Sequence, residues 1–438
     1  MRKRLTISVG MALLVLGTAA TAAADEVTDW NRTFFRAALI AGSSPLATTR
    51  LSAILEAAVF DAVNGIERRY APVHVAPAGP SGASVRAAAM QAAYVALSKI
   101  YPAQQLTIDL RRAASLADIR AHESGAAVDA GIAWGESVAN QIWAWRLTDG
   151  IAITTPPWLG NTAIGQWRQT PNAPLPGTST PGAGYPQFFG MTPWVIASPS
   201  QFQAPPPPAL TSAKYARDFN EVKTMGSQAS TQRTADQTIA SLVWNSSTAP
   251  YLWNNAALSL IEDGRGDDDR DGEGHGRERH EDTRLLEHAR VLGTLNVAMA
   301  DAAIACWDTK YTYNFWRPIT AIRELADDGN AATTPDAAWT PLISTPAHPS
   351  YSSGHSCVSA AAAGILAHEF GERSRFDIES DAMIGVVRSF RTFSSALDEV
   401  KNARIFGGIH FRFDCDAGQA IGASVANFVL EHAFQRVH

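Results

Sequence analysis

The chain has 438 residues, of which 46% are hydrophobic and 18% are charged, a composition typical of a folded globular protein and not of a disordered one. Its length suits one large domain or two ordinary ones. The formal net charge of −6 at pH 7 leaves no basic surplus, so the sequence does not predict a nucleic-acid-binding protein.

The first 24 residues have the features of a secretory signal peptide. A basic start precedes a short apolar run, and small residues end at Ala24. We therefore predict cleavage near Ala24 and export, which makes the mature chain secreted, periplasmic or extracellular. No later segment reaches the roughly 18 uninterrupted apolar residues that would predict a membrane span.

Residues 25–153 are predicted to form an N-terminal helical region. Apolar residues recur at helical spacing over 47–69, 84–101 and about 125–145, and alanine is abundant. Residues 154–210 then change in character, with proline-rich motifs such as PPPPAL and frequent aromatic residues. A connection this long is usually functional or disordered, and its aromatic residues favour a packed loop that lines a pocket.

Residues 211–438 are predicted to form a helical catalytic region, with Thr211 as a candidate helix cap. A long helix is expected over 283–309 and two more after His355, the last beginning near Asp414. No segment shows a convincing strand alternation. The predicted fold class is therefore all-α, built of helical bundles with long proline-rich connections.

An acidic insertion at residues 262–282 admits two interpretations. Its composition is typical of a solvated, mobile segment. Alternatively, the pattern D-x-D-x-D-G-x5-E of a calcium-binding loop matches here, although the normally apolar position 8 is a glycine. The solvated segment is the favoured interpretation. The possible calcium ligands are Asp267, Asp269, Asp271 and Glu278.

Three short motifs near the C-terminal end carry the candidate chemistry. They are Lys310 and Arg317 in KYTYNFWRP, Ser353-Gly354-His355 at a predicted helix start, and Arg404, His410 and Asp414 in RIFGGIHFRFD. Each motif has an ordinary structural explanation on its own, because lysines and arginines are usually solvated and SSGH can be a capped turn.

Together the motifs supply the groups that bind a tetrahedral oxyanion. The two arginines offer fork-shaped donors and the lysine a point charge. A glycine at a helix N-terminus allows close approach of backbone N–H groups, and Ser353 adds a hydroxyl.

The histidines provide proton transfer and a nucleophile or ligand. His410 and Asp414 are four residues apart, so on a helix the carboxylate would hold one ring nitrogen and point the other at the anion. His355 could act as a general acid or base on an apical oxygen. The sequence therefore predicts a phosphate-like site with no required divalent cation.

The three motifs, in this order, resemble those of the vanadium-dependent haloperoxidase and type 2 phosphatidic acid phosphatase superfamily, in particular its secreted bacterial haloperoxidase-related group. Ser352 stands in place of a usual proline, and Ala403 in place of a usual serine. The resemblance implies a helical-bundle fold. It also implies that vanadate or phosphate is held by Lys310, Arg317, Ser353, Gly354 and Arg404.

The resemblance implies one of two activities. In a haloperoxidase, His410 would be the apical vanadium ligand, His355 would assist proton transfer, and hydrogen peroxide would oxidise a halide. In an acid phosphatase or phosphoesterase, His410 would attack the phosphorus of a phosphate monoester, His355 would protonate the leaving group and Asp414 would orient His410. A non-catalytic protein that binds an oxyanion or calcium is the third hypothesis.

His348 and Trp307 bear on this choice. His348 lies five residues before Ser353, where the family's bromoperoxidases carry a histidine and its fungal chloroperoxidases an aromatic residue. The alternative is a histidine that only caps the HPSY turn. Trp307 matches a family aromatic residue near the halide. These matches favour a haloperoxidase that oxidises bromide or iodide rather than chloride, with the oligomeric state left open.

The three cysteines lie within the segments of the predicted site. An odd number allows at most one disulfide bond within the chain. Because all three belong to these segments, buried free thiols are favoured. They are Cys306, Cys357 and Cys415.

Overall fold

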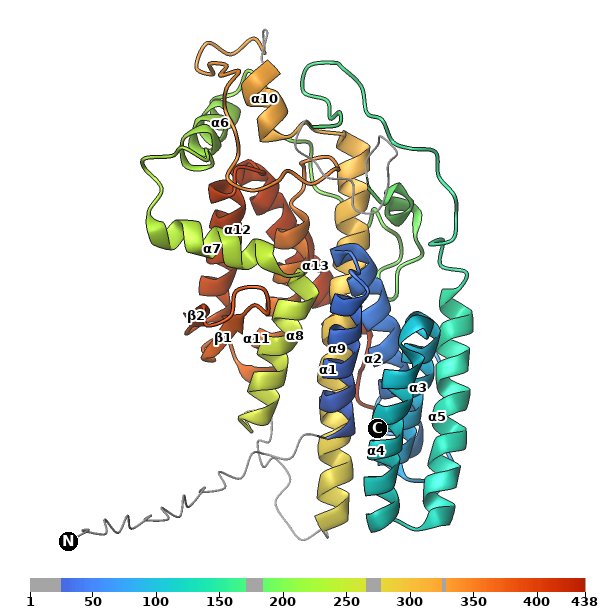
Figure 1. Ribbon diagram of the computed structural model, residues 1–438. Coiled ribbons are helices and arrows are strands. Elements are labelled where there is room, and N and C mark those ends of the chain that lie inside the picture. Colours follow the sequence, from blue (N-terminus) through green and yellow to red (C-terminus); the bar gives the residue numbers. More distant parts are fainter. Residues whose placement is uncertain (1–24, 171–183, 265–276, 325–327, 438) are drawn as a thin grey trace, which may run out of the picture.

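The computed structural model describes residues 25–170, 184–264, 277–324 and 328–437 (Figure 1). The predicted signal peptide lies outside these ranges, as do the candidate calcium positions Asp267, Asp269 and Asp271. Glu278 lies in the first turn of a helix, and its side chain is not described. Within the described ranges, no group of three or more His, Cys, Asp or Glu is placed to hold a metal ion.

The described chain is mostly helical, as predicted. The helices are α1 (Glu26–Ile40), α2 (Pro45–Glu67), α3 (Val85–Ile100), α4 (Gln105–His122), α5 (Gly125–Arg146), α6 (Ala213–Met225), α7 (Ala235–Ser246), α8 (Ala249–Glu262), α9 (Arg277–Tyr313), α10 (Pro318–Glu324), α11 (Gly354–Phe370), α12 (Phe393–Phe406) and α13 (Arg412–His432), with two short 3-10 helices, η1 (Pro102–Gln104) and η2 (Pro186–Gly190). The helices predicted from periodicity over 47–69, 84–101 and 125–145 correspond to α2, α3 and α5.

One small β-hairpin departs from the all-α prediction. Strands β1 (Phe376–Glu379) and β2 (Val387–Phe390) pair antiparallel, with Phe376 opposite Phe390. Residues of β1 alternate between buried and exposed. Four residues are too few for such an alternation to stand out in the sequence.

Serine and threonine side chains begin many of the helices. Ser44, Ser84 and Ser124 accept hydrogen bonds from backbone N–H groups in the first turns of α2, α3 and α5. At the start of α6 this role belongs to Ser212, which accepts from the N–H of Tyr215. The prediction of Thr211 as the cap was therefore wrong by one residue.

Small residues let the helices of the N-terminal region pack closely. At Gly131 and Gly135 of α5, an added Cβ would lie 2.3 Å from the carbonyl oxygens of Ser84 and Ala88. Only glycine allows α5 to approach α3 at this distance. Helices α2, α3 and α5 bury a common alanine-rich core, and α2 also packs against α9.

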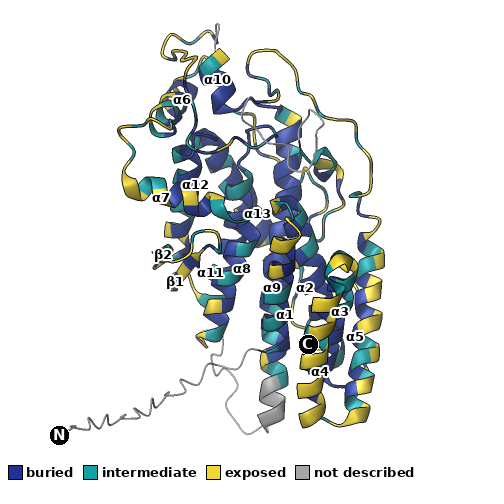
Figure 2. Ribbon diagram, in the orientation of Figure 1, coloured by how far each residue is buried: buried dark blue, intermediate teal, exposed yellow. Residues whose placement is uncertain are grey.

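Helix α9 is the central element of the molecule (Figure 2). Its segment Asp282–Tyr313 is the one described stretch long and apolar enough to cross a membrane, yet 94% of its apolar window is buried inside the protein. This is the pattern of a core helix. Helices α11 and α13 pack against α9 and against each other, where Gly418 and Gly422 of α13 lie close to the α11 backbone.

The described parts of the connection 154–210 are packed against the helices. The buried carboxylate of Asp301 on α9 accepts the N–H groups of three consecutive residues at 2.7 to 3.0 Å, Trp194 to Ile196. Further along, the hydroxyl of Tyr313 donates to the carbonyl oxygen of Ala204 at 2.8 Å. These bonds fix the connection beside the C-terminal half of α9.

Candidate active site

The fold brings the three sequence motifs together at the ends of five helices. Lys310 is in the last turn of α9, and Arg317 lies just before α10. Ser353 caps α11, and Gly354 is its first residue. Arg404 is in the last turn of α12, while His410 and Asp414 flank the start of α13.

The three cationic side chains of the site are buried. Lys310 and Arg317 are 0% exposed and Arg404 is 1% exposed. Burial lowers the pKa of Arg317 to about 9 and that of Arg404 to about 10, and it also lowers the pKa of Lys310. The arginines remain protonated at neutral pH. Buried charges are costly unless they are paired, so this cluster favours an anion.

Arg317 links the two histidines on either side of it. Its Nη1 lies 3.1 Å from Nε2 of His410 and donates to the carbonyl oxygen of Ile409 at 2.8 Å. Its Nη2 lies 3.0 Å from Nδ1 of His348, and its Nε donates to the His348 carbonyl oxygen at 2.8 Å. A guanidinium only donates hydrogen bonds, so both imidazoles act as acceptors towards it. In agreement, burial lowers the pKa of both histidines well below the usual value.

His410 is oriented by Asp414, but not in the way that the sequence suggested. We expected both residues on one helical face, whereas α13 begins at Arg412 and His410 precedes it. The Asp414 carboxylate turns back over the start of the helix, where one oxygen accepts from the N–H of Phe411 at 3.1 Å and lies 3.0 Å from Nδ1 of His410. The same oxygen accepts the Ser350 hydroxyl at 2.5 Å. The predicted pairing is therefore present with a different backbone geometry.

Ser353 and Gly354 form the helix N-terminus that faces this cluster. The Ser353 hydroxyl oxygen accepts from Ser356 Oγ at 3.1 Å and from its N–H, which leaves its own proton to donate. At Gly354 an added Cβ would lie 3.0 Å from the ring of Trp307. That ring also lies 5.5 Å from Nζ of Lys310 and 4.9 Å from the His348 ring.

His355 and Arg404 share a partner in the last turn of α7. The Trp244 carbonyl oxygen accepts Nη1 of Arg404 at 3.2 Å and a ring nitrogen of His355. Nη2 of Arg404 donates to the Asn245 side chain at 3.4 Å. Among the described residues, neither Nε of Arg404 nor Nε2 of His355 has a hydrogen-bond partner, although both atoms are buried.

These observations fit a bound tetrahedral oxyanion such as vanadate or phosphate. Three buried cations face a single buried carboxylate, that of Asp414, whose pKa burial raises. Nε of Arg404, which has no hydrogen-bond partner among the described residues, the Ser353 hydroxyl and a glycine at a helix N-terminus complete the set. His348, Gly354 and His355 are the partly exposed members, so the site opens to solvent on their side.

Comparisons with known proteins bear on the fold and on the C-terminal region that carries this site. Residues 290–438 match the family model of the VCPO second helical-bundle domain. A bacterial vanadium-dependent iodoperoxidase has the same fold over 94% of this chain and 97% of its own, with a TM-score of 0.75 and 24% identity. The chain therefore has the fold of the vanadium haloperoxidases, and its residues 290–438 are similar to their second helical-bundle domain.

Two further relatives extend this result. A holo-type bacterial vanadium-dependent chloroperoxidase aligns over 94% of this chain and 93% of its own, with a TM-score of 0.65 and 14% identity. The vanadium chloroperoxidase of Curvularia inaequalis is 26% identical over 295 residues, which are 53% of this chain and 46% of that protein. The present chain thus matches about half the length of this curated relative.

Some contributors to the site were not predicted. Ser350, which holds Asp414, lies in the HPSY segment, and no spacing in the sequence marked it as a site residue. Trp244 and Asn245 lie about 160 residues before Arg404 in the chain, and no sequence signal connected them to it. The three cysteines are free and buried, as predicted.

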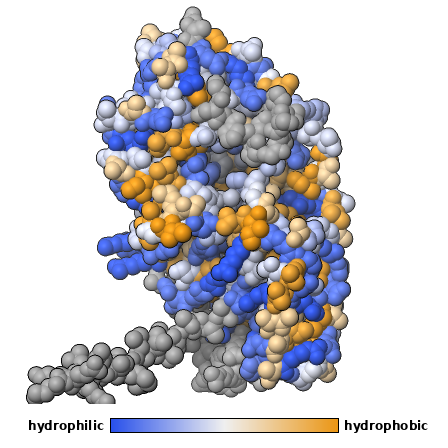
Figure 3. Space-filling view, in the orientation of Figure 1, coloured by the Kyte–Doolittle hydropathy of each residue, from blue (hydrophilic) through white to orange (hydrophobic). Residues whose placement is uncertain are grey.

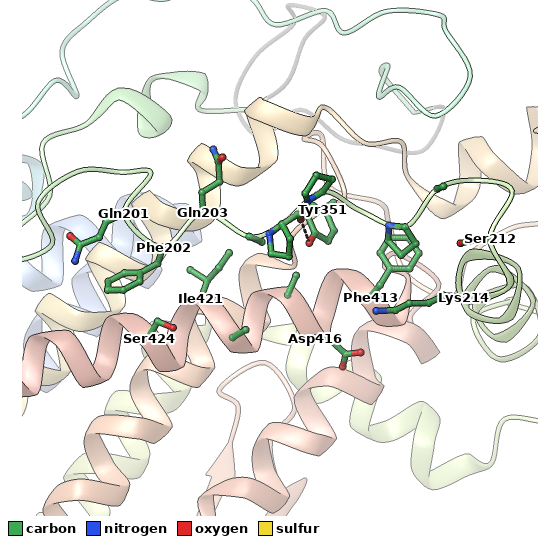
Figure 4. Close-up of a pocket in the computed structure, with 17 residues that line it drawn as sticks. Gln201, Phe202, Gln203, Ser212, Lys214, Tyr351, Phe413, Asp416, Ile421 and Ser424 are labelled. Atoms are coloured by element: carbon green, nitrogen blue, oxygen red, sulfur yellow. Dashed lines mark hydrogen bonds between the residues drawn. The ribbon is translucent and has the colours of Figure 1, made fainter.

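A cavity on another face of α13 is separate from this site (Figure 4). It has a volume of about 690 Å³, and none of the predicted site residues lines it. Tyr351 and Phe413 form part of its wall, and the Tyr351 hydroxyl donates to the carbonyl oxygen of Pro205 at 2.7 Å. The PPPP segment thus lies beside α13 without reaching the cationic cluster.

Proposed function

We propose that this chain is a vanadate-dependent haloperoxidase that oxidises a halide with hydrogen peroxide. The observation that carries the proposal is the buried cluster of Lys310, Arg317 and Arg404 around His410, whose buried Nε2 lies 3.1 Å from Nη1 of Arg317. Vanadate, when bound, supplies a Lewis acid that activates hydrogen peroxide towards the halide. The remaining chemistry belongs to the side chains of this protein.

The cationic cluster and the start of α11 bind and orient the oxyanion. Lys310, Arg317 and Arg404 neutralise the oxyanion, and the Ser353 hydroxyl and the Gly354 backbone add hydrogen bonds. Asp414 holds Nδ1 of His410 and so turns Nε2 towards Arg317, where this nitrogen would serve as the vanadium ligand.

Proton transfer belongs to His355. Burial and the nearby Arg404 charge lower its pKa well below the usual value, so the imidazole is neutral at pH 7. Its unpartnered Nε2 can then take a proton from hydrogen peroxide and return it to a leaving oxygen. His355 is partly exposed although its Nε2 is buried, so this exchange would take place just inside the open side of the site.

For the halide we propose bromide or iodide rather than chloride. His348 places an imidazole beside Arg317 and the Trp307 ring, at the open side of the site. A neutral imidazole there can adjust protonation at the bound oxyanion. The likeness to an iodoperoxidase in fold supports the same choice.

We also propose that the protein acts outside the cytoplasm, after cleavage near Ala24. The basic, apolar and small-residue order of the first 24 residues supports this. Edman sequencing or mass spectrometry of the protein exported by its natural host tests it, with Asp25 as the expected first residue.

The function is tested with the purified mature chain in phosphate-free buffer. With orthovanadate and hydrogen peroxide, we expect bromination of a phenol dye or oxidation of iodide, and no such activity in His410→Ala. Hydrolysis of p-nitrophenyl phosphate without halide oxidation would instead support the phosphatase, because phosphate has the same shape and His410 and His355 suit both reactions. If neither reaction occurs and His410→Ala behaves as the wild type, the protein is a non-catalytic oxyanion binder.

A further inference from the structure

A second cavity, of about 260 Å³, lies between α1, the start of α2 and the turn from α7 to α8. Figure 1 shows this turn beside the C-terminal end of α1. Its lining combines apolar and polar side chains. The apolar ones include Phe35, Leu39, Pro45 and Tyr251, and the polar ones include Asn245 and Thr248.

A single segment of chain, Trp244 and Asn245, lies between this cavity and the cationic site. Asn245 lines the cavity, and its side-chain oxygen accepts Nη2 of Arg404. The preceding residue, Trp244, presents its carbonyl oxygen to both Arg404 and His355. A molecule in the cavity that contacts Asn245 would therefore be separated from Arg404 by this side chain and from His355 by the backbone of Trp244.

The lining of the cavity selects a neutral ligand with an aromatic ring. No charged side chain is among the described residues that line it, so a strongly charged ligand would find no partner. An apolar cavity of about 150 Å³ is enough to bind benzene, and drug-sized ligands need about 300 Å³ or more. The volume of this cavity, about 260 Å³, lies between these two values and suits a ligand with one substituted ring. The amide and hydroxyls of the lining can bind a ring hydroxyl.

Leu39 is an exposed apolar residue of the lining. Its side chain is 59% exposed, and the neighbouring Ile40, at the end of α1, is 72% exposed. Figure 3 shows apolar side chains gathered on the face that carries α7 and this end of α1. Exposed apolar surface beside a catalytic site is often functional.

We propose that this cavity binds a phenol-class organic acceptor that is halogenated by the oxidised halogen released at the cationic site. This inference rests on the proposed function. In the net reaction the arene, the halide, hydrogen peroxide and one proton give the aryl halide and two molecules of water. The ring carbon forms its bond to halogen and loses its hydrogen as a proton, while the peroxide O–O bond is reduced. Asn245, in the segment between the cavity and the cationic site, positions the acceptor.

Direct binding tests the cavity without requiring catalysis. We expect 4-iodophenol to bind the mature protein in a calorimetric titration and to give an anomalous iodine peak between Leu39, Tyr251 and Asn245 in a crystal. Leu39→Glu places a carboxylate among the apolar lining residues and should raise the Kd at least tenfold. Ile40→Glu adds the same charge outside the cavity and should leave the Kd unchanged. No binding, or equal Kd values in the two variants, would overturn the proposal.

A second measurement separates this proposal from the proposed function. In vanadate-loaded protein, Leu39→Glu should raise the KM for phenol bromination at least tenfold and leave iodide oxidation to triiodide unaltered. If both rates fall together or neither changes, the acceptor does not use the cavity. If 4-iodophenol binds the cavity but the wild type oxidises no halide, the cavity is an aromatic site and the haloperoxidase proposal fails.

Discussion

Arg404→Met should stabilise the free protein while it weakens oxyanion binding. The Arg404 guanidinium is 1% exposed, and burial lowers its pKa from the usual arginine value to about 10. A shift of this size corresponds to about 3 kcal/mol of unfavourable charge burial in the absence of an anion. Methionine has a similar volume and no charge, and replacing a buried charge by an apolar side chain is often stabilising by about 1–4 kcal/mol.

Few partners of Arg404 lose their hydrogen bonds in this variant. The Trp244 carbonyl oxygen keeps its bond from His355, and the Asn245 side chain is exposed to water. We therefore expect the free energy of unfolding to rise by about 1–3 kcal/mol without vanadate. Loss of a charge-assisted hydrogen bond of about 1.5–3 kcal/mol should weaken vanadate binding by about tenfold to a hundredfold.

Urea unfolding and calorimetric titration with orthovanadate measure the two effects separately. Arg412→Met is the matched control, because it removes the same charge from a partly exposed ion pair with Glu221. That control should bind vanadate as tightly as the wild type. Saturating vanadate should stabilise the wild type by about 2.7 kcal/mol at a hundred times Kd, and Arg404→Met much less. The reasoning is refuted if Arg404→Met destabilises the free protein by several kcal/mol or binds vanadate normally.

Three further predictions concern packing, pH and the connection. Gly354→Ala should weaken vanadate binding about tenfold in a calorimetric titration, because its methyl group must displace the Trp307 ring, whereas Gly125→Ala, with open space around it, should not. Burial raises the pKa of Glu56 to about 8, so the folded state keeps a proton that the unfolded state loses near pH 4.5. The free energy of unfolding of the wild type, measured in urea, should therefore fall by about 1 kcal/mol per pH unit between pH 5 and 8. Glu56→Gln should not show this fall. Asp301→Ala leaves three backbone N–H groups unsatisfied and should lower the free energy of unfolding by about 3 kcal/mol or more, and an unchanged thermal midpoint would contradict this.

Much of the fold and site could be predicted because the relevant signals are local in the sequence. Alanine-rich helical periodicity located α2, α3 and α5 within a few residues. Lys310 and Arg317, the SGH motif, and the Arg404 to Asp414 segment each contain several site residues within eleven positions or fewer. Their residue types agree on one chemistry, and the fold brings them together.

The features that escaped prediction depend on distance or on exact backbone geometry. The contact of Asn245 with Arg404 joins residues far apart in the chain, and periodicity carries no information about it. The start of α13 at Arg412 depends on Asp414 capping the N–H of Phe411, which a helical pattern alone does not specify. Ser212 and not Thr211 caps α6, in line with the stronger preference for serine at this position.

A crystal structure of the mature protein with orthovanadate tests the central claim most directly. The account predicts vanadium bound to Nε2 of His410 and enclosed by Lys310, Arg317 and Arg404. Vanadium bound elsewhere, or a site that stays empty at saturating orthovanadate, would contradict it.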